Sequence, residues 1–148
     1  MKLTLTIPCI PLSGNRLVGK YRSTSERKKW FKLIHREAFD DNTSMLKCNW
    51  FYLSIGGANW FSLIPKKAKM KLVVTEYRQT LLDRTNLETS IKPIEDALQP
   101  YKMVGKKRYV GIGLIWNDNE EWLDREVSQI KVAHRAEQKT VIQLEELT

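Results

Sequence analysis

Residues 69–98 constrain the fold most, because they place a β-strand directly before an amphipathic helix. Apolar and polar side chains largely alternate in residues 69–77 (KMKLVVTEY), which predicts a half-buried strand. Over residues 86–98 apolar side chains recur at helical spacing, at Leu87, Ile91, Ile94 and Leu98. Pro93 lies inside this helix, and we expect it to kink the helix and to free the carbonyl of Thr89.

The rest of the chain adds strands and one more helix. We expect three further strands, at residues 2–7, 127–134 and 139–147, the last two joined by a turn near residues 136–138. A helix is expected over residues 25–39, preceded by a capping box of Ser23 and Glu26. Residues 40–64 allow no assignment. The sequence therefore predicts an α+β fold, a single domain with a small mixed β-sheet of about four strands packed against two helices.

The helix over residues 25–39 has two different faces. Its apolar face carries Trp30, Phe31, Ile34 and Ala38. Its opposite face carries Lys28, Lys29, Lys32, His35 and Arg36. That second face could bind phosphates, or it could simply be solvated, and the sequence leaves both possibilities open.

The charge of the chain is uneven. Residues 1–74 hold 14 Lys and Arg against 4 Asp and Glu (+10), and residues 75–148 hold 11 against 13 (−2), which together give the net charge of +8. A basic half joined to an acidic half suits a polyanion binder that also carries metal-seeking carboxylates, although ordinary surface charge would look the same.

Several classes of protein are disfavoured. No stretch approaches the roughly 18 apolar residues of a membrane span. The N-terminus alternates instead of forming a signal peptide, so we expect a cytoplasmic protein, in a bacterial or phage-infected cell. Cys9 and Cys48 have no metal-ligand spacing, which disfavours zinc. His35 and His134 are not expected to be catalytic, and no motif indicates a small-molecule cofactor.

Four side chains could carry chemistry. Asp83 lies between a strand and a helix, Lys92 and Asp96 are one helical turn apart, and Asp118 follows the apolar run GLIW. Carboxylates at such junctions can share a Mg²⁺ ion, which activates water and neutralises charge on a phosphodiester. A nearby lysine can stabilise the same developing charge. Scattered acids are also common in loops, so this pattern alone is weak.

The order of these motifs resembles a known family. The run LLDRTNLETSIKPIEDAL contains D-x-x-N-L, then K-P, then D-A-L, and N-D follows about twenty residues later. With the N-terminal strand and PLSGN, this resembles the RusA-like family of Holliday-junction resolvases, which are crossover junction endodeoxyribonucleases of phages and prophages. The resemblance covers residues 3–18 and 70–135.

The resemblance implies a homodimer that resolves four-way DNA junctions by paired phosphodiester hydrolysis, with Mg²⁺ (Mn²⁺ possible) as cofactor. It implies that Asp83, Lys92 and Asp118 are catalytic and that Asp83 and Asp118 hold the metal. Asn86 matches the asparagine of the family's D-x-D-N motif.

This sequence departs from the family pattern at two positions. Thr85 stands where the second aspartate of D-x-D-N belongs, and Asn117 stands where the first acid of the Asp-Asp pair belongs. Thr85 with Glu88 is expected to form a capping box. Because the neutral hydroxyl is a poorer ligand than a carboxylate, a substitute ligand is needed. The candidates are Glu88, Asp124 and Glu76.

The loss of an acid leaves alternatives. A catalytically weakened or inactive protein that binds junctions or other structured DNA is one, and an RNA-binding or RNA-cleaving factor is another. The expected DNA-binding residues are Asn15, Arg16, Lys20, Arg22, Arg84, Asn86, Lys106, Lys107 and Arg108. The 105–108 loop could contact phosphates or be only a soluble loop. Trp116 and Trp122 are expected in the core, with stacking on unpaired bases as the alternative.

Overall fold

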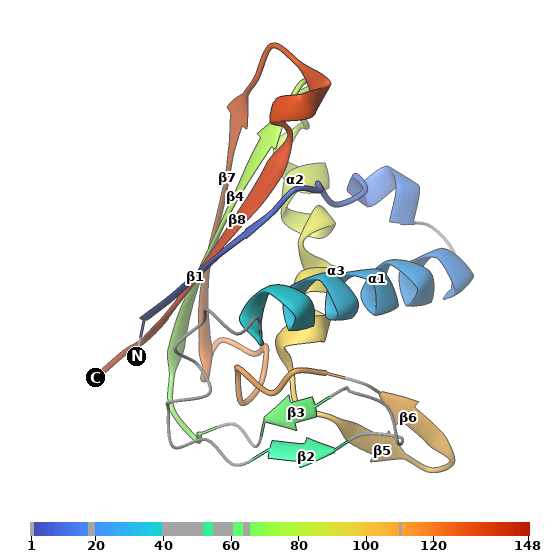
Figure 1. Cartoon of the computed structure of the whole chain (residues 1–148), viewed down its shortest axis with the longest axis vertical. Coiled ribbons are helices and arrows are strands. Elements are labelled where there is room, and N and C mark those ends of the chain that lie inside the picture. The colour runs from blue at the N-terminus through green and yellow to red at the C-terminus, as the bar shows by residue number, and fades with distance from the viewer. Residues whose placement is uncertain (1, 18–19, 40–51, 55–60, 64–65, 110) are drawn as a thin grey trace.

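A four-stranded mixed sheet forms one layer of the molecule, and the helices lie on one side of it (Figure 1). The computed structural model describes residues 2–17, 20–39, 52–54, 61–63, 66–109 and 111–148. The strand order is β1-β8-β4-β7, with antiparallel neighbours except for the parallel pair β4–β7. The sheet strands are β1 (Lys2–Ile7), β4 (Met70–Arg78), β7 (Leu123–Lys131) and β8 (Lys139–Glu146). The predicted α+β class is confirmed.

The other elements are helices, 3₁₀ turns and two separate hairpins. The helices are α1 (Lys20–Ala38), α2 (Arg84–Ser90) and α3 (Lys92–Leu98), with short 3₁₀ turns η1 (Gly14–Leu17) and η3 (Arg135–Glu137). Two hairpins stand apart from the sheet, β2 (Tyr52–Ser54) with β3 (Phe61–Leu63), and β5 (Lys102–Val104) with β6 (Lys107–Tyr109). Apart from β2 and β3, residues 40–64 lie outside the described residues. Among the described helices, none combines the length and the apolar character that a membrane crossing needs.

The core lies between the sheet and the helices. Alternate β4 residues from Met70 to Arg78 are buried, and the apolar ones pack with Trp30, Ile34 and other apolar side chains of α1. The predicted apolar face of α1 is confirmed. His35 was expected on the charged face but is buried, between the rings of Phe31 and Phe39. Aromatic neighbours one turn away on each side explain its burial.

Three predicted boundaries were wrong. Helix α1 begins at Lys20, so Ser23 lies inside the helix and cannot cap it. Strand β7 begins at Leu123, four residues earlier than expected, because its exposed outer residues hide the alternation there. The same strand ends at Lys131 and not at residue 134, and η3 then leads into β8.

Pro93 has the predicted effect on the second helix. The helix is divided into α2 and α3 at Ile91, and Pro93 occupies the first turn of α3, where its missing N–H costs nothing. The carbonyl of Thr89, which was expected to be free, instead accepts a hydrogen bond from the Ile91 N–H. The break lets α3 begin afresh at Lys92.

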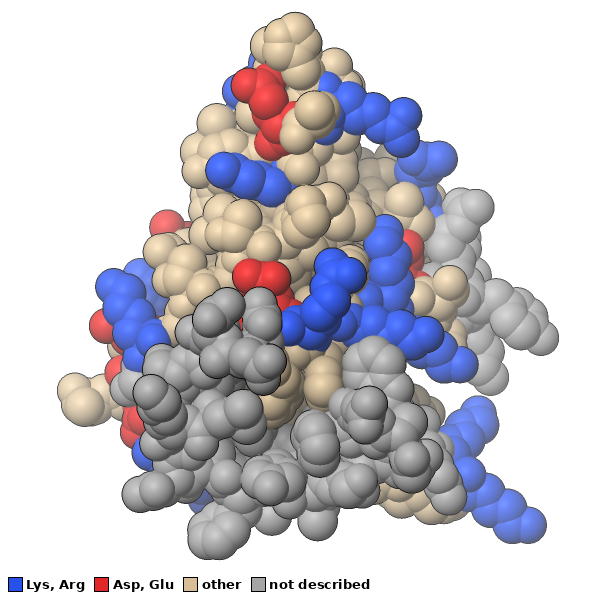
Figure 2. Space-filling view, viewed as in Figure 1, with Lys and Arg blue, Asp and Glu red and all other residues tan. Residues whose placement is uncertain are grey.

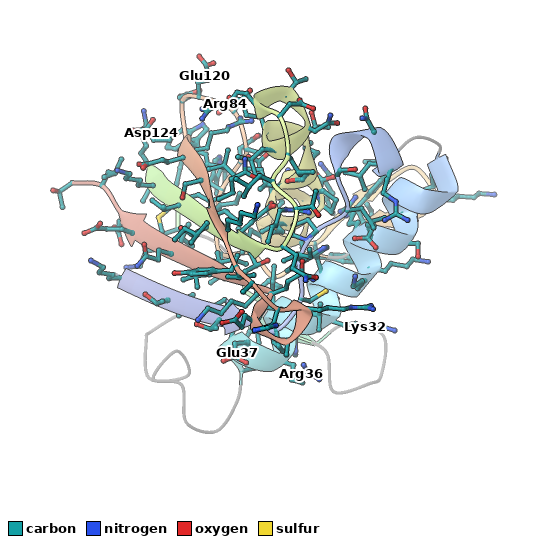
Figure 3. All side chains as sticks on the ribbon, turned by 90° about the horizontal axis from the view of Figure 1, so that it is seen from above. Lys32, Arg36, Glu37, Arg84, Glu120 and Asp124 are labelled. Carbon is teal, nitrogen blue, oxygen red and sulfur yellow. The ribbon has the colours of Figure 1, made fainter. Side chains whose placement is uncertain are left out.

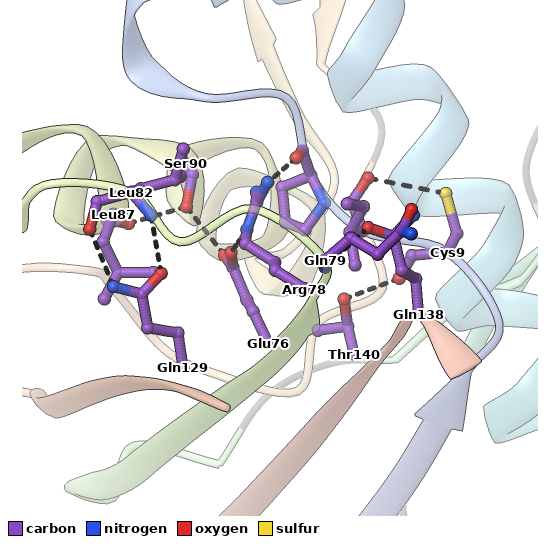
Figure 4. A network of polar contacts seen from close by, with 12 residues as sticks. Cys9, Glu76, Arg78, Gln79, Leu82, Leu87, Ser90, Gln129, Gln138 and Thr140 are labelled. Atoms are coloured by element: carbon purple, nitrogen blue, oxygen red, sulfur yellow. Dashed lines mark hydrogen bonds and ion pairs between the residues drawn. The ribbon is translucent and has the colours of Figure 1, made fainter. Parts of the chain in front are cut away.

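A buried polar cluster joins three parts of the chain (Figure 4). Arg78 forms an ion pair with Glu76 on β4 and donates to the carbonyl of Pro11 at 2.5 Å. The Ser90 hydroxyl on α2 donates to the other oxygen of Glu76 at 2.7 Å. Burial raises the pKa of Glu76, while Arg78 and Ser90 oppose that rise. The cluster therefore fixes the N-terminal loop and α2 to the sheet.

Gln129 of β7 holds the loop that leads to α2. Its side-chain oxygen accepts from the Leu82 N–H at 2.9 Å, and its side-chain nitrogen donates to the Leu82 carbonyl at 2.7 Å. One amide side chain thus supplies both hydrogen bonds that a neighbouring strand would give. The chain is fixed one residue before Asp83.

Removing Arg78 should be costly, because it leaves the carboxylate of Glu76 buried without its partner. We predict that Arg78→Ala lowers the free energy of unfolding by about 3–5 kcal/mol in urea denaturation. The exposed residue Lys131, opposite Arg78 in the β4–β7 register, provides the control. Lys131→Ala should change the free energy of unfolding by about 0.5 kcal/mol or less. Equal effects of the two substitutions would contradict a structural role for the cluster.

Candidate active site

The apolar run before Asp118 packs against the end of α3. The N–H groups of Ile112 and Leu114 donate to the carbonyls of Ala97 and Leu98, each at 2.8 Å. A Cβ on Gly111 would lie 1.9 Å from the Gln99 carbonyl oxygen, so only glycine permits this approach. From there the chain runs back along α3 toward its first residue.

This path brings Lys92 and Asp118 together, 26 residues apart in sequence. The Lys92 ammonium donates a short hydrogen bond to the Asp118 carboxylate. The same nitrogen lies 3.2 Å from an Asp96 oxygen and 3.9 Å from a Glu95 oxygen. Two of the three predicted catalytic residues therefore meet, and Asp96, noted in the sequence one turn from Lys92, joins them.

The contact between Lys92 and Asp118 shifts the pKa values of both side chains. Partial burial raises the pKa of Asp118, but the hydrogen bond and charge of Lys92 outweigh it, so this pKa is lowered. Partial burial lowers the pKa of Lys92, but Asp118 and Asp96 outweigh it, so this pKa is raised. The stabilisation from Asp118 is lost as pH falls through its lowered pKa, and that from Lys92 is lost as pH rises through its raised pKa. Both groups are charged across the neutral range.

Two further residues complete the cluster and were missed in the sequence. Arg125 of β7 donates to the Asp118 carbonyl at 2.7 Å and lies 3.5 Å from a Glu95 oxygen. The Glu95 side chain is buried, and burial raises its pKa against the opposing charges of Arg125 and Lys92. The sequence did contain one indication of the burial of Glu95, because Glu95 lies one helical turn after the apolar residue Ile91. Nothing in the sequence marked Arg125.

Asp83 has a structural role at the start of α2. It is the N-cap of α2, accepting from the Asn86 N–H at 3.0 Å and from the Asn86 side-chain nitrogen at 2.6 Å. These two bonds lower the pKa of Asp83. The Asn86 side-chain oxygen accepts from the Asn15 N–H at 2.8 Å, which ties the N-terminal loop to α2. Two predicted DNA-binding residues, Asn15 and Asn86, thus contact each other.

The expected Thr85–Glu88 capping box is therefore wrong. Asp83 caps the helix, and the carbonyl of Thr85 accepts from the Thr89 hydroxyl at 2.8 Å. Glu88 forms an ion pair with Arg84 at 2.5 Å. The error arose because the motifs D-x-x-N and T-x-x-E overlap in the sequence, and the residue that caps the helix is the earlier one, Asp83.

Asp83 does not join the cluster around Lys92. Asp83 precedes α2 and Lys92 begins α3, so the seven residues of α2, about 10 Å of helix rise, lie between them. The contacts of Asp83 are with Asn86, whereas the ion pairs of Lys92 are with Asp118, Asp96 and Glu95. The structure thus unites the lysine with the later acid but not with the earlier one.

The candidate substitute ligands are engaged elsewhere. Glu76 is buried with Arg78, Glu88 pairs with Arg84, and Asp124 pairs with Lys69 at 2.7 Å. In the part of the chain that the structure describes, no three His, Cys, Asp or Glu side chains form a group that could hold a metal. These residues therefore fit Mg²⁺ only where one or two carboxylates hold it and water and phosphate complete its shell.

An open cleft of about 740 Å³ lies between α2 and the start of β7. Its lining residues are Lys69, Arg84, Glu88, Ile91, Glu120, Leu123, Asp124, Arg125 and Val127. Figure 3 shows Arg84, Glu120 and Asp124 at the same edge of the molecule, opposite Lys32 and Arg36 of α1. Three cations and three carboxylates balance in the cleft, so its lining alone is not strongly phosphate-binding.

Basic side chains gather on a different face. Figure 2 shows Lys and Arg side chains in a band over α1 and again where the β5–β6 hairpin projects. Lys28, Lys29, Lys32 and Arg36 are exposed on α1, and Lys106 and Lys107 are exposed at the hairpin. Tyr109 of the hairpin lies under Arg27 at 5.0 Å and Lys102 at 5.8 Å from its ring centre, so the hairpin contacts α1.

The other predicted DNA-binding residues are dispersed. Arg16 lies in η1, and Arg84 is exposed at the first turn of α2. Lys20 and Arg22 lie in α1 and Arg108 lies in β6, but their side chains are outside the described part. The structure therefore distributes the set over the N-terminal loop, the start of α1, the α2 edge and the hairpin.

Trp116 was expected in the core, and that prediction was wrong. Its side chain is 38% exposed, and Trp122 is half-buried beside it. The rings are in edge-to-face contact with centres 6.4 Å apart. The buried run ends one residue earlier, at Ile115, where the hydrogen bonds to α3 end as well.

The chain matches no protein-family model and no curated protein sequence.

The Lys92–Asp118 contact can be tested by titration. We predict that Asp118→Asn shifts the pKa of Lys92 down toward its ordinary value, because the strongest stabilisation of the ammonium is removed. The shift can be followed by NMR of labelled lysine side chains. Asp96→Asn is the matched control and should lower the pKa by less. A larger shift in Asp96→Asn would mean that Asp118 is not the main partner.

Proposed function

We propose that the protein is a structure-selective endodeoxyribonuclease that cuts four-way DNA junctions, with Lys92 and Asp118 at its reaction centre. The observation that carries the proposal is the contact between these two residues, which the RusA-like pattern places in one active site. Packing of residues 111–115 on α3 holds them there. A phosphodiester bound beside the Lys92 ammonium would have its developing negative charge stabilised.

The other residues around Lys92 would bind the metal or position the reacting side chains. Asp118 would hold Mg²⁺ or Mn²⁺ beside Lys92. The resemblance adds Asp83 as a second ligand, although Asp83 lies apart from Lys92 in the structure, as described above. When bound, the ion supplies an activated water and neutralises charge on the phosphodiester. Asp96 and Arg125 position Lys92 and the Asp118 loop through the contacts described above.

Binding of the DNA backbone is assigned to the basic surfaces. The α1 band and the β5–β6 hairpin carry exposed lysines, and Arg84 stands at the edge of the cleft. Because a junction has four duplex arms, it can contact more than one face of a protein. In a homodimer, two-fold symmetry would present two reaction centres for paired nicks.

Cleavage of a synthetic four-way junction tests this function. We predict that the protein with Mg²⁺ nicks the junction and that Asp118→Asn abolishes nicking while binding is retained. Loss of a charge-stabilising or ligating carboxylate accounts for the effect. The control is Glu120→Gln, an exposed acid in the same loop, which should keep full activity. Product strands are resolved on denaturing gels and binding by gel shift.

The absence of nicking with Mg²⁺ and with Mn²⁺ would overturn the nuclease proposal. Equal loss in Glu120→Gln and Asp118→Asn would instead indicate a general effect of loop charge.

A second candidate function is a junction-binding protein that has lost cleavage. The observation that favours it is the state of the D-x-x-N segment, where both oxygens of Asp83 bond to Asn86 and Thr85 supplies no carboxylate. Such a protein would occupy junctions through the same basic surfaces.

Thr85→Asp distinguishes the two functions. Thr85 is exposed in the first turn of α2, where an acidic side chain is favourable to the helix, so the substitution should not disturb folding. We predict that Thr85→Asp raises Mg²⁺-dependent nicking several-fold, because it restores a charged ligand. Thr85→Asn, similar in size but neutral, is the control. If neither changes cleavage, the first turn of α2 takes no part in metal binding.

A further inference from the structure

Trp116, Trp122 and Lys67 form an exposed aromatic site beside Asp118. The Lys67 nitrogen lies 5.9 Å from the ring centre of Trp116 and 5.6 Å from that of Trp122. Both distances are within the range of cation–π attraction. The three side chains come from two segments, the one before β4 and the one before β7.

Backbone hydrogen bonds hold the loop that carries Trp122. The Trp122 carbonyl accepts from the Met70 N–H at 2.9 Å, which joins the two segments at the start of the parallel strands. The Trp122 N–H and the Leu123 N–H both donate to the Asn119 carbonyl, at 3.1 and 2.9 Å. Arg125 bonds the Asp118 carbonyl in the same loop. The backbone that carries Trp122 is therefore fixed to the start of β4.

Lys67 differs from the lysines around it. Lys66 lies 3.9 Å from Glu146, and Lys69 lies 2.7 Å from Asp124. Among the described residues no carboxylate lies within ion-pair distance of Lys67, and its charge rests over the two indole rings. A positive charge above an exposed aromatic face suits a ligand that offers both a π-face and an anion.

We propose that this site binds an unpaired base of single-stranded DNA, with the base stacked on Trp116 and the adjacent phosphate held by Lys67. This inference rests on the proposed function for DNA as the ligand. Base–aromatic stacking tolerates any base, since every base has a π-face. A paired base inside a duplex cannot offer that face.

The location gives the site a role in selectivity. Trp116 is two residues from Asp118, so their Cα atoms are at most about 7 Å apart. A strand whose base is captured on Trp116 would place a neighbouring phosphate close to Asp118 and Lys92. The aromatic site would thus favour DNA with opened bases over fully paired duplex.

A binding experiment without divalent ions tests the inference separately from cleavage. The probes are a fluorescent twelve-nucleotide thymidine strand and an abasic strand of equal length, which has the same phosphates without bases. We expect the protein to bind the thymidine strand at least about fivefold more tightly, the lower limit for one stacked base. Trp116→Leu should lose this preference, whereas Trp116→Phe should retain most of it.

Lysine variants separate the phosphate contact from general charge. Lys67→Ala should weaken binding to both strands and reduce the salt slope by about 0.7, the value for one phosphate on a single strand. Lys66→Ala is the matched control and should have a smaller effect, because Glu146 already opposes its charge. Circular dichroism checks that each variant is folded.

The outcomes are distinct from those of the cleavage assay. Equal affinity for the two strands, or an unchanged preference in Trp116→Leu, would overturn the aromatic site even if junctions are nicked. Equal effects of Lys67→Ala and Lys66→Ala would remove Lys67 from it. A Trp116-dependent preference without nicking would support the site and refute the nuclease.

Discussion

The buried ion pair between Glu76 and Arg78 is the interaction on which the arrangement of the candidate site depends. It lies at the end of β4 that leads to α2, and its remaining hydrogen bonds go to Ser90 of α2 and to the Pro11 carbonyl. Burying two charges is favourable only when both are paired and hydrogen-bonded, and here both conditions are met. The pair thereby fixes the N-terminal loop, β4 and α2 in one geometry.

The placement of Asp83 and Asn86 follows from this geometry. With the N-terminal loop held at Pro11, Asn15 can donate its N–H to Asn86, which in turn bonds Asp83. A Cβ on Gly14 would lie 2.8 Å from the Cβ of Thr89, so the loop sits directly on α2. The PLSGN segment is therefore explained by packing at the start of α2.

The elements with strong local signals were predictable, and those set by tertiary contacts were not. The alternation in β4 and the helical stripe from Leu87 to Leu98 were confirmed, because burial on one face dictates both patterns. Proline chemistry correctly located the break before Pro93. The start of β7 was missed, because its outward residues face solvent on a strand at the edge of the sheet.

The candidate site was predictable only in part. The meeting of Lys92 and Asp118 followed from a resemblance in motif order, since no spacing rule joins residues so far apart. Trp116 was misassigned because an apolar run gives no sign of where its packing ends. Glu95 and Arg125 carry no local signal, and their role appears only once β7 lies beside α3.

Gly111 affects the position of Asp118, which lies seven residues further along the chain. With the Gln99 carbonyl so close, any side chain at this position would push residues 112–115 outward and lengthen the path from the end of α3 to Asp118. The displacement would reach Asp118, three residues later, whose carboxylate meets Lys92 through one hydrogen bond. The contact between Asp118 and Lys92 thus depends on the absence of one methyl group at the opposite end of a seven-residue helix.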